Sequence, residues 1–163
     1  MGTTYDDIVI GAGILGLATA THLSARGRKV AILERSNRAR GASVRNFGMV
    51  WPIGQPAGER LEVALESRAA WEATLLEAGV WFEPVGSLHA AYFDDEAEVL
   101  HEFARDANER GFNVELLNPA AAIARSPRLV RDGLRSALLS RTEACVDPRQ
   151  AVAGIAADRK SVV

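Results

Sequence analysis

Three glycines at positions 11, 13 and 16 form the most informative spacing in the chain. The run Gly11 to Gly16 has the pattern of a dinucleotide-binding turn, in which a strand passes through glycines into a helix. The first glycine permits the turn, the second lets the backbone approach a pyrophosphate, and the third lets helix and sheet pack closely. The phosphates then meet free N–H groups at the start of the helix. The residues predicted to contact them are Gly11, Ala12, Gly13, Ile14, Leu15 and Gly16.

A carboxylate about twenty residues further on supports this interpretation. Glu34 follows the apolar segment 29–33, where an acidic side chain can accept hydrogen bonds from the hydroxyls of a ribose. Its charge would repel a 2′-phosphate, which argues against NADP. Arg35 follows directly and has two interpretations, contact with adenine or ribose and a solvated surface position. A glycine turn that binds nothing is the weaker alternative, because strand, glycines, helix and acid occur in the required order.

The elements that must position these residues are a strand, a helix and a second strand. Residues 7–10 and 29–33 are short apolar runs, and residues 14–26 carry apolar side chains at helical spacing. Three elements in about thirty residues are the minimum for a right-handed parallel crossover. The sequence therefore predicts an α/β fold that opens with a Rossmann-like βαβ unit.

The segment 35–58 is rich in arginine and glycine and predicts a long, structured loop. A classical NAD-binding domain would proceed to another helix and a third parallel strand, so this loop favours FAD. Within it, short polar groups and bare backbone could line the pyrophosphate and ribityl chain of an extended flavin. The loop residues predicted to do so are Gly41, Ala42, Ser43, Asn46 and Gly48.

At this point the chain resembles the FAD-dependent amine and amino-acid oxidoreductases, the family of D-amino-acid oxidase, glycine oxidase and sarcosine oxidase. The resemblance is carried by the glycine turn, by Glu34 and by the loop 41–48, and continues in segments 86–88 and 146–149. The run 43–56 is similar to a bacterial subgroup associated with aminophosphonate breakdown.

The resemblance implies oxidation of the C–N bond of a small amine or amino acid by hydride transfer from the α-carbon to flavin. Catalytic residues and the electron acceptor stay unassigned. Three alternatives remain: an NAD-dependent dehydrogenase half-domain, a nucleotide-binding fragment without chemistry, and another flavin enzyme such as a hydroxylase.

The resemblance also implies a domain organisation. Residues 1–79 would be the N-terminal part of the FAD-binding domain, 80–140 part of an α+β substrate domain, and 141–163 the start of the return to the FAD-binding domain. Such an enzyme would be more than twice as long as this chain of 163 residues. We therefore expect an apparently truncated protein with little activity alone, which needs a missing C-terminal half or self-association to cover its exposed strands.

Further along the chain, periodicity and turn signals predict helices and strands in alternation. The predicted helices cover 59–78, 94–110 with Asp94 or Asp95 as cap, a short helix opened by Asn118, and 148–158 opened by Asp147. The predicted strands cover 80–82, 87–93, 113–116 and 134–139.

Composition limits the partners. A net charge of −2 gives no field that would recruit nucleic acid, and no apolar run reaches the ~20 residues of a membrane span. The single cysteine, Cys145, allows no internal disulfide and is expected to be a small buried side chain. We expect a cytoplasmic protein with a small-molecule substrate.

Other polar and aromatic residues admit two interpretations each. His22, His89 and His101 are not spaced as metal ligands, so no metal site is expected; His89 could face a substrate cavity or be a satisfied structural histidine. Trp51 could approach the flavin or anchor its loop in the core.

Two tryptophans and one arginine complete the candidates. Trp71 and Trp81 are expected in the core. Arg45 could lie near the flavin or an anionic substrate, or on the surface.

Overall fold

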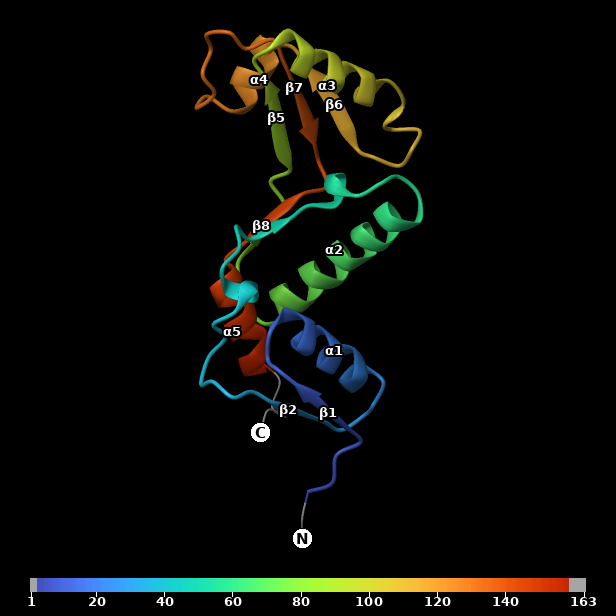
Figure 1. Cartoon of the computed structure of the whole chain (residues 1–163), viewed down its shortest axis with the longest axis vertical. Coiled ribbons are helices and arrows are strands. Elements are labelled where there is room, and N and C mark those ends of the chain that lie inside the picture. Colours follow the sequence, from blue (N-terminus) through green and yellow to red (C-terminus); the bar gives the residue numbers. More distant parts are fainter. Residues whose placement is uncertain (1–2, 159–163) are drawn as a thin grey trace. The chain divides into compact units, whose positions relative to one another are not determined.

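The computed structural model describes residues 3–158, which form two compact units (Figure 1). The first unit takes its described residues from segments 3–49, 70–82 and 146–158. The second unit takes residues 50–69 and 83–145. The chain therefore leaves the first unit twice and returns to it twice.

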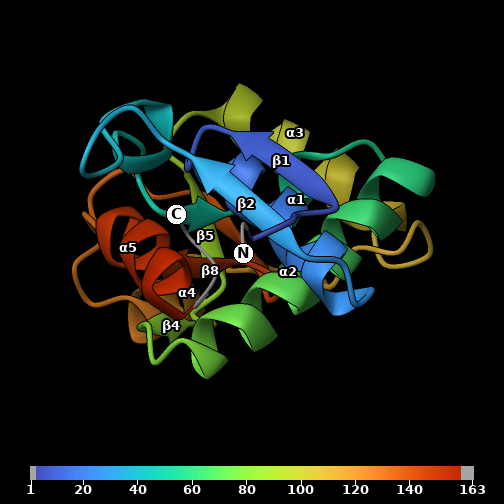
Figure 2. The same ribbon diagram turned by 90° about the horizontal axis from the view of Figure 1, so that it is seen from below.

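The first unit opens with the predicted strand, helix and strand. Strands β1 (Asp7–Ile10) and β2 (Val30–Leu33) pair in parallel, with Asp7 opposite Val30 and Ile10 opposite Leu33, and Figure 2 shows them side by side. Helix α1 (Ile14–Ala25) connects them and contacts both strands. The predicted βαβ unit is confirmed.

The core of the first unit lies beside α1. Leu17 of α1 is buried, as are Leu75 of α2 (Glu59–Glu77) and Ile155 of α5 (Pro148–Asp158). The β1–β2 sheet has only these two strands among the described residues, and Ile10 is 87% exposed. Apolar side chains of this two-stranded sheet are therefore exposed.

The segment between Glu34 and α2 has little regular structure, as predicted, but it contains three short elements. They are η1 (Ala42–Val44), β3 (Met49–Val50) and η2 (Pro52–Gly54). Strand β3 joins β4 (Phe82–Glu83) and β8 (Ala144–Val146) in a sheet of order β3-β8-β4. The sequence does not predict β3 and β8, because two or three residues are too few to show a period of two.

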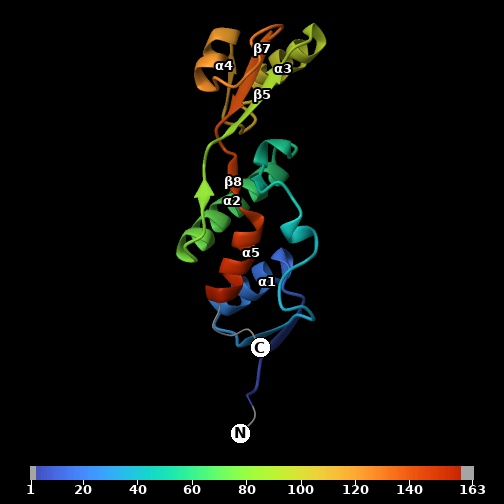
Figure 3. The same cartoon turned by 90° about the vertical axis from the view of Figure 1, so that its left-hand side faces the viewer.

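The second unit contains an antiparallel sheet of order β5-β7-β6. Its strands are β5 (Ser87–Ala91), β6 (Val114–Leu117) and β7 (Ser136–Ser140). On central strand β7, Leu138 packs in one hydrophobic cluster, whereas Ala137 and Leu139 pack in another. Alternate residues of a strand point to opposite faces, so both faces of the sheet are covered. Helices α3 (Asp94–Asp106) and α4 (Pro119–Arg125) lie on opposite sides of it (Figure 3).

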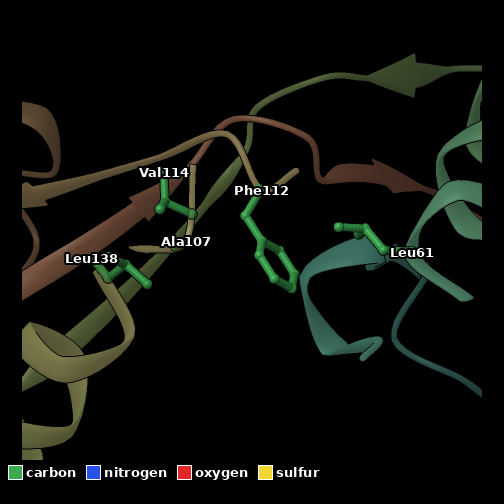
Figure 4. Packing of buried hydrophobic residues seen from close by; sticks show 5 residues of the cluster. All are labelled: Leu61, Ala107, Phe112, Val114 and Leu138. Carbon is green, nitrogen blue, oxygen red and sulfur yellow. The ribbon is translucent and has the colours of Figure 1, made fainter. Parts of the chain in front are cut away.

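The first of these clusters takes one residue from α2. Figure 4 shows the ring of Phe112 between Leu61 of α2 and the side chains of Val114 and Leu138. Because Leu61 belongs to the second unit and Leu75 to the first, α2 supplies buried side chains to both units.

Several sequence-based expectations need correction. Helix α3 ends at Asp106 rather than 110, and its cap is Phe93, whose N–H donates to the side chain of Glu96 (3.2 Å), rather than Asp94 or Asp95. Trp81 is 50% exposed, although a core position was predicted. Cys145 lies in β8 and is only partly buried. Trp71 is partly buried.

Candidate cofactor site

The turn between β1 and α1 is built by glycines that bring backbone segments close together. Gly11 has φ = +100° and donates its N–H to the carbonyl of Leu33 (2.7 Å), so the turn starts beside the end of β2. Gly16 lies against the carbonyl oxygen of Gly11, which a Cβ at Gly16 would overlap. Helix and turn can therefore approach this closely only without a side chain at position 16.

The first turn of α1 presents backbone donors that no described residue uses. The N–H groups of Gly13, Leu15 and Gly16 have no acceptor within residues 3–158. The N–H of Ile14 donates to Ser43 Oγ (3.0 Å). That hydroxyl keeps its own hydrogen to donate, since it serves here as an acceptor. Unused N–H groups at a helix N-terminus, with the positive end of the helix dipole, suit an anion.

Glu34 lies at the glycine turn, as the sequence predicts. Its Oε2 accepts the N–H of Ala12 (2.9 Å) and its Oε1 accepts the N–H of Ser36 (3.0 Å). The bond from Ala12, followed by the bond from Ser36, lowers the pKa of the Glu34 carboxyl below its usual value. The carboxylate is exposed, and each oxygen retains a lone pair for a further donor such as a ribose hydroxyl.

Asn46 holds the loop that carries Ser43. Its Nδ2 donates to the carbonyls of Ala42 (3.2 Å) and Ser43 (3.0 Å), and its Oδ1 accepts the N–H of Gly48 (2.8 Å). Both ends of this side chain are thus used within the loop, and Asn46 acts here by positioning Ser43.

The return segment fastens the end of the same loop. Gly48 has φ = +68°, and a Cβ there would overlap the carbonyl oxygen of Val146. The N–H of Val146 donates to the carbonyl of Gly48 (2.8 Å). Asp147 then caps α5, with Oδ1 accepting the N–H groups of Arg149 (2.8 Å) and Gln150 (3.1 Å). The bond from Gln150, followed by that from Arg149, lowers the pKa of Asp147.

The remaining predicted site residues are near the turn or loop in sequence but are less engaged. Arg35, Gly41 and Ala42 are exposed, and Gly41 precedes η1, which contacts α5. Arg45 is exposed as well, on the surface of the loop. The structure thus gathers the glycine turn, Glu34 and Ser43, while the contact between loop and return segment is one that spacing alone did not predict.

Neither a membrane-spanning helix nor a metal site occurs in the part of the chain that the structure describes. Within residues 3–158, no helix combines the length and apolar character needed to cross a membrane. The same residues contain no group of three or more His, Cys, Asp or Glu that could hold a metal ion.

A parallel βαβ unit with a glycine turn, free helix N-terminal donors and an acid after the second strand defines a nucleotide-binding Rossmann-like domain. Residues 6–161 match the family described as FAD dependent oxidoreductase, the DAO family. The chain belongs to this family, which decides between the flavin and nicotinamide alternatives in favour of FAD.

The similar proteins include enzymes with different substrates. One polypeptide of the anaerobic glycerol-3-phosphate dehydrogenase of Escherichia coli K12 is 27% identical over 158 residues, which are 95% of this chain and 28% of that protein. The structure of glycine oxidase from Geobacillus kaustophilus is 25% identical with a TM-score of 0.83, over 98% of this chain and 45% of that one. The FAD-bound L-α-glycerophosphate oxidase of Mycoplasma pneumoniae shares the fold, with 22% identity, a TM-score of 0.80, and coverage of 99% and 44%. The chain thus spans less than half the length of each.

Proposed function

We propose that this chain is the N-terminal part of an FAD-dependent oxidoreductase that oxidises the C–N bond of a small amine or amino acid. The observation that carries the proposal is that two side chains bind the glycine turn. Glu34 accepts the N–H of Ala12, and Ser43 accepts the N–H of Ile14. The likeness to glycine oxidase supports an amine substrate.

The residues present fit the phosphate and ribose parts of FAD. The N–H groups of Gly13, Leu15 and Gly16 would bind the pyrophosphate, and the Ser43 hydroxyl would donate to it. A Cβ at Gly13 would lie 3.1 Å from Ser43 Oγ, so glycine keeps this space open. Glu34 would accept the ribose hydroxyls. The other residues proposed to line the cofactor are Gly11, Ala12, Ile14, Arg35, Gly41, Ala42, Asn46 and Gly48.

FAD, when bound, would supply the acceptor for a hydride from the substrate α-carbon. Loss of that hydride from the amine would leave an iminium ion, which water would convert to a carbonyl compound and ammonium. The part of the protein described here would bind and orient the cofactor, with residues 1–79 and 141–163 assigned to the FAD-binding domain and 80–140 to the substrate domain. No residue of this chain is assigned to proton transfer.

The test uses the chain together with the rest of its natural protein. Denaturing the purified protein should release FAD, and anaerobic addition of glycine, other amino acids or an aminophosphonate should bleach the flavin absorbance. Release of NAD instead would refute the cofactor assignment. Bleaching by glycerol 3-phosphate and by no amine would refute the amine assignment and favour a glycerol-phosphate substrate, the class named in two of the similar proteins.

A further inference from the structure

A buried carboxylate in the second unit has no role in the cofactor site. Glu143, between β7 and β8, is only 3% exposed, and no lysine or arginine among the described residues pairs with it. Its Oε1 accepts the N–H of Ile53 (3.1 Å) and the hydroxyl of Thr142 (2.8 Å), and its Oε2 accepts the hydroxyl of Ser87 (3.1 Å). Burying a carboxylate is costly unless hydrogen bonds compensate it, and here three donors do so.

The Ser87 hydroxyl links this carboxylate to an imidazole. Ser87 Oγ lies 2.9 Å from His89 Nε2, because alternate residues of β5 share one face. A hydroxyl has one hydrogen, and Ser87 gives it to Glu143, so His89 Nε2 must be the donor in the second bond. Neutral His89 is therefore the Nε2–H tautomer with a lone pair on Nδ1. No described residue bonds to that Nδ1.

Trp51 lies beside this imidazole. The two rings stack with centroids 6.2 Å apart and an interplanar angle of 20°, and Trp51 remains 47% exposed. Neither interpretation of Trp51 from the sequence foresaw this contact. The negative charge of Glu143, the lone pair of His89 Nδ1 and the π-system of the indole all favour a positively charged hydrogen-bond donor.

We propose that His89 and Trp51 recognise the amino group of the substrate. In this arrangement His89 Nδ1 accepts a hydrogen bond from the substrate ammonium, while Ser87 and Glu143 fix the tautomer that leaves this lone pair available. His89 and Trp51 contact the substrate, and Glu143 is a positioning residue. The inference rests on the proposed amine oxidation and names the part of the second unit that selects an amine.

The proposed positions of the protons on Ser87 and His89 can be tested without measuring enzyme activity. Nitrogen-15 NMR of the flavin-loaded full-length protein should show neutral His89 protonated at Nε2. In Glu143→Gln, the amide oxygen replaces Oε1 as acceptor for Ile53 and Thr142, and the amide N–H donates to Ser87. Ser87 must then donate to His89 Nε2, so His89 becomes the Nδ1–H tautomer. An unchanged tautomer in this variant, or Nδ1–H in the wild type, overturns the proposed relay. His101 serves as an internal control and should not change.

The recognition role is tested in the flavin-loaded full-length protein. We expect His89→Phe, which retains a ring beside Trp51, and Glu143→Gln to raise the half-saturating amine concentration at least about 10-fold, a loss of about 1.4 kcal/mol. The maximal rate of flavin reduction should change less. His101→Phe is the matched control. Unchanged half-saturation in both variants overturns the proposal.

Failure of the proposed function gives a different result. If no amine reduces the bound flavin, ethylammonium chloride and ethanol can be titrated while the His89 nitrogen resonances are followed. A shift with ethylammonium alone supports the ammonium site even though the proposed reaction is wrong. No shift with ethylammonium, or equal shifts with both, overturns the site.

Discussion

The glycine turn and the Glu143 cluster, which comprises Glu143, Ser87, His89 and Thr142, are built in opposite ways. The turn offers backbone N–H groups from one run of six residues, joined to an acid 22 positions away. The cluster consists of side chains, in which Glu143 binds the Ser87 hydroxyl 56 positions away and also accepts the backbone N–H of Ile53, 90 positions away. A site made of backbone constrains residue types at fixed spacing, whereas a site made of distant side chains leaves no local pattern.

This contrast predicts that the turn is intolerant of added atoms. In Gly16→Ala the new Cβ meets the backbone carbonyl of Gly11, which cannot move without disturbing the β1–α1 turn. We expect a loss of at least about 3 kcal/mol of unfolding free energy, at the upper end for overpacking, together with loss of FAD binding. Urea unfolding and FAD titration measure the two effects.

The matched control for this variant is Gly41→Ala. Gly41 has a negative φ and no atom within 4 Å of a new Cβ, so its stability should change little. Equal stability losses in the two variants would contradict the close-approach argument.

The cluster should instead depend on its acceptor atoms. Glu143→Ala removes the acceptor of Ile53 N–H, Thr142 and Ser87, and each buried donor left unsatisfied costs about 1–3 kcal/mol. We expect the unfolding free energy to fall by about 2–3 kcal/mol in total, because the vacated space lets water reach some of these donors. Glu143→Gln should recover most of this loss in the same urea experiment. If alanine and glutamine variants are equally stable, the hydrogen bonds of this carboxylate are not structural.

The difference between the two regions also explains what the sequence predicted. The βαβ unit, the proximity of Glu34 to the turn, and the Asn118 and Asp147 caps were predicted because each depends on residue types within a few positions or on a known crossover geometry. Ser43 was predicted to belong to the site, and the structure places it at the turn. The hydrogen bond from Ile14 N–H to Ser43 Oγ that holds it there could not be predicted from residue spacing. Alternation in β5 puts Ser87 and His89 on one face, but no residue near them in the sequence indicates that Glu143 lies beside them.

The errors have the same origin. Strands β3 and β8 were missed because strands of two or three residues are too short to show a hydrophobic period. Trp81 was wrongly predicted to be buried, because a single aromatic residue has no periodic pattern that indicates its burial. At Gly48 the sequence predicted close backbone approach but not its partner in the fold, the carbonyl of Val146.

Ser43 combines features of both regions, because its side chain completes a site that otherwise consists of backbone N–H groups. Ser43→Ala leaves the N–H of Ile14 without its acceptor, and the N-cap Gly13 offers helix α1 no side-chain bond. We expect a loss of about 1 kcal/mol in unfolding free energy, as for other caps, and weaker FAD binding. Ser36→Ala is the control, because only the backbone of Ser36 contacts Glu34. Equal FAD affinities for the two variants would remove Ser43 from the proposed site.

The smallest expected effect concerns the charge of Glu34. Bonds from Ala12 and Ser36 lower its pKa in the folded protein, so the carboxylate stabilises the fold above the unfolded pKa of about 4.3. This contribution is lost as pH falls through the lower, folded value, because protonation weakens the acceptor. Glu34→Gln should therefore flatten the decline in stability below that pH, whereas Glu77→Gln, an exposed change at the end of α2, should leave the decline as it is. Urea midpoints measured between about pH 6 and about pH 3 compare the three proteins across this window. If stability falls equally with pH in wild type and Glu34→Gln, the bonds from Ala12 and Ser36 do not stabilise the ionised Glu34 carboxylate. The predicted link between Glu34 and the turn would then rest on geometry alone.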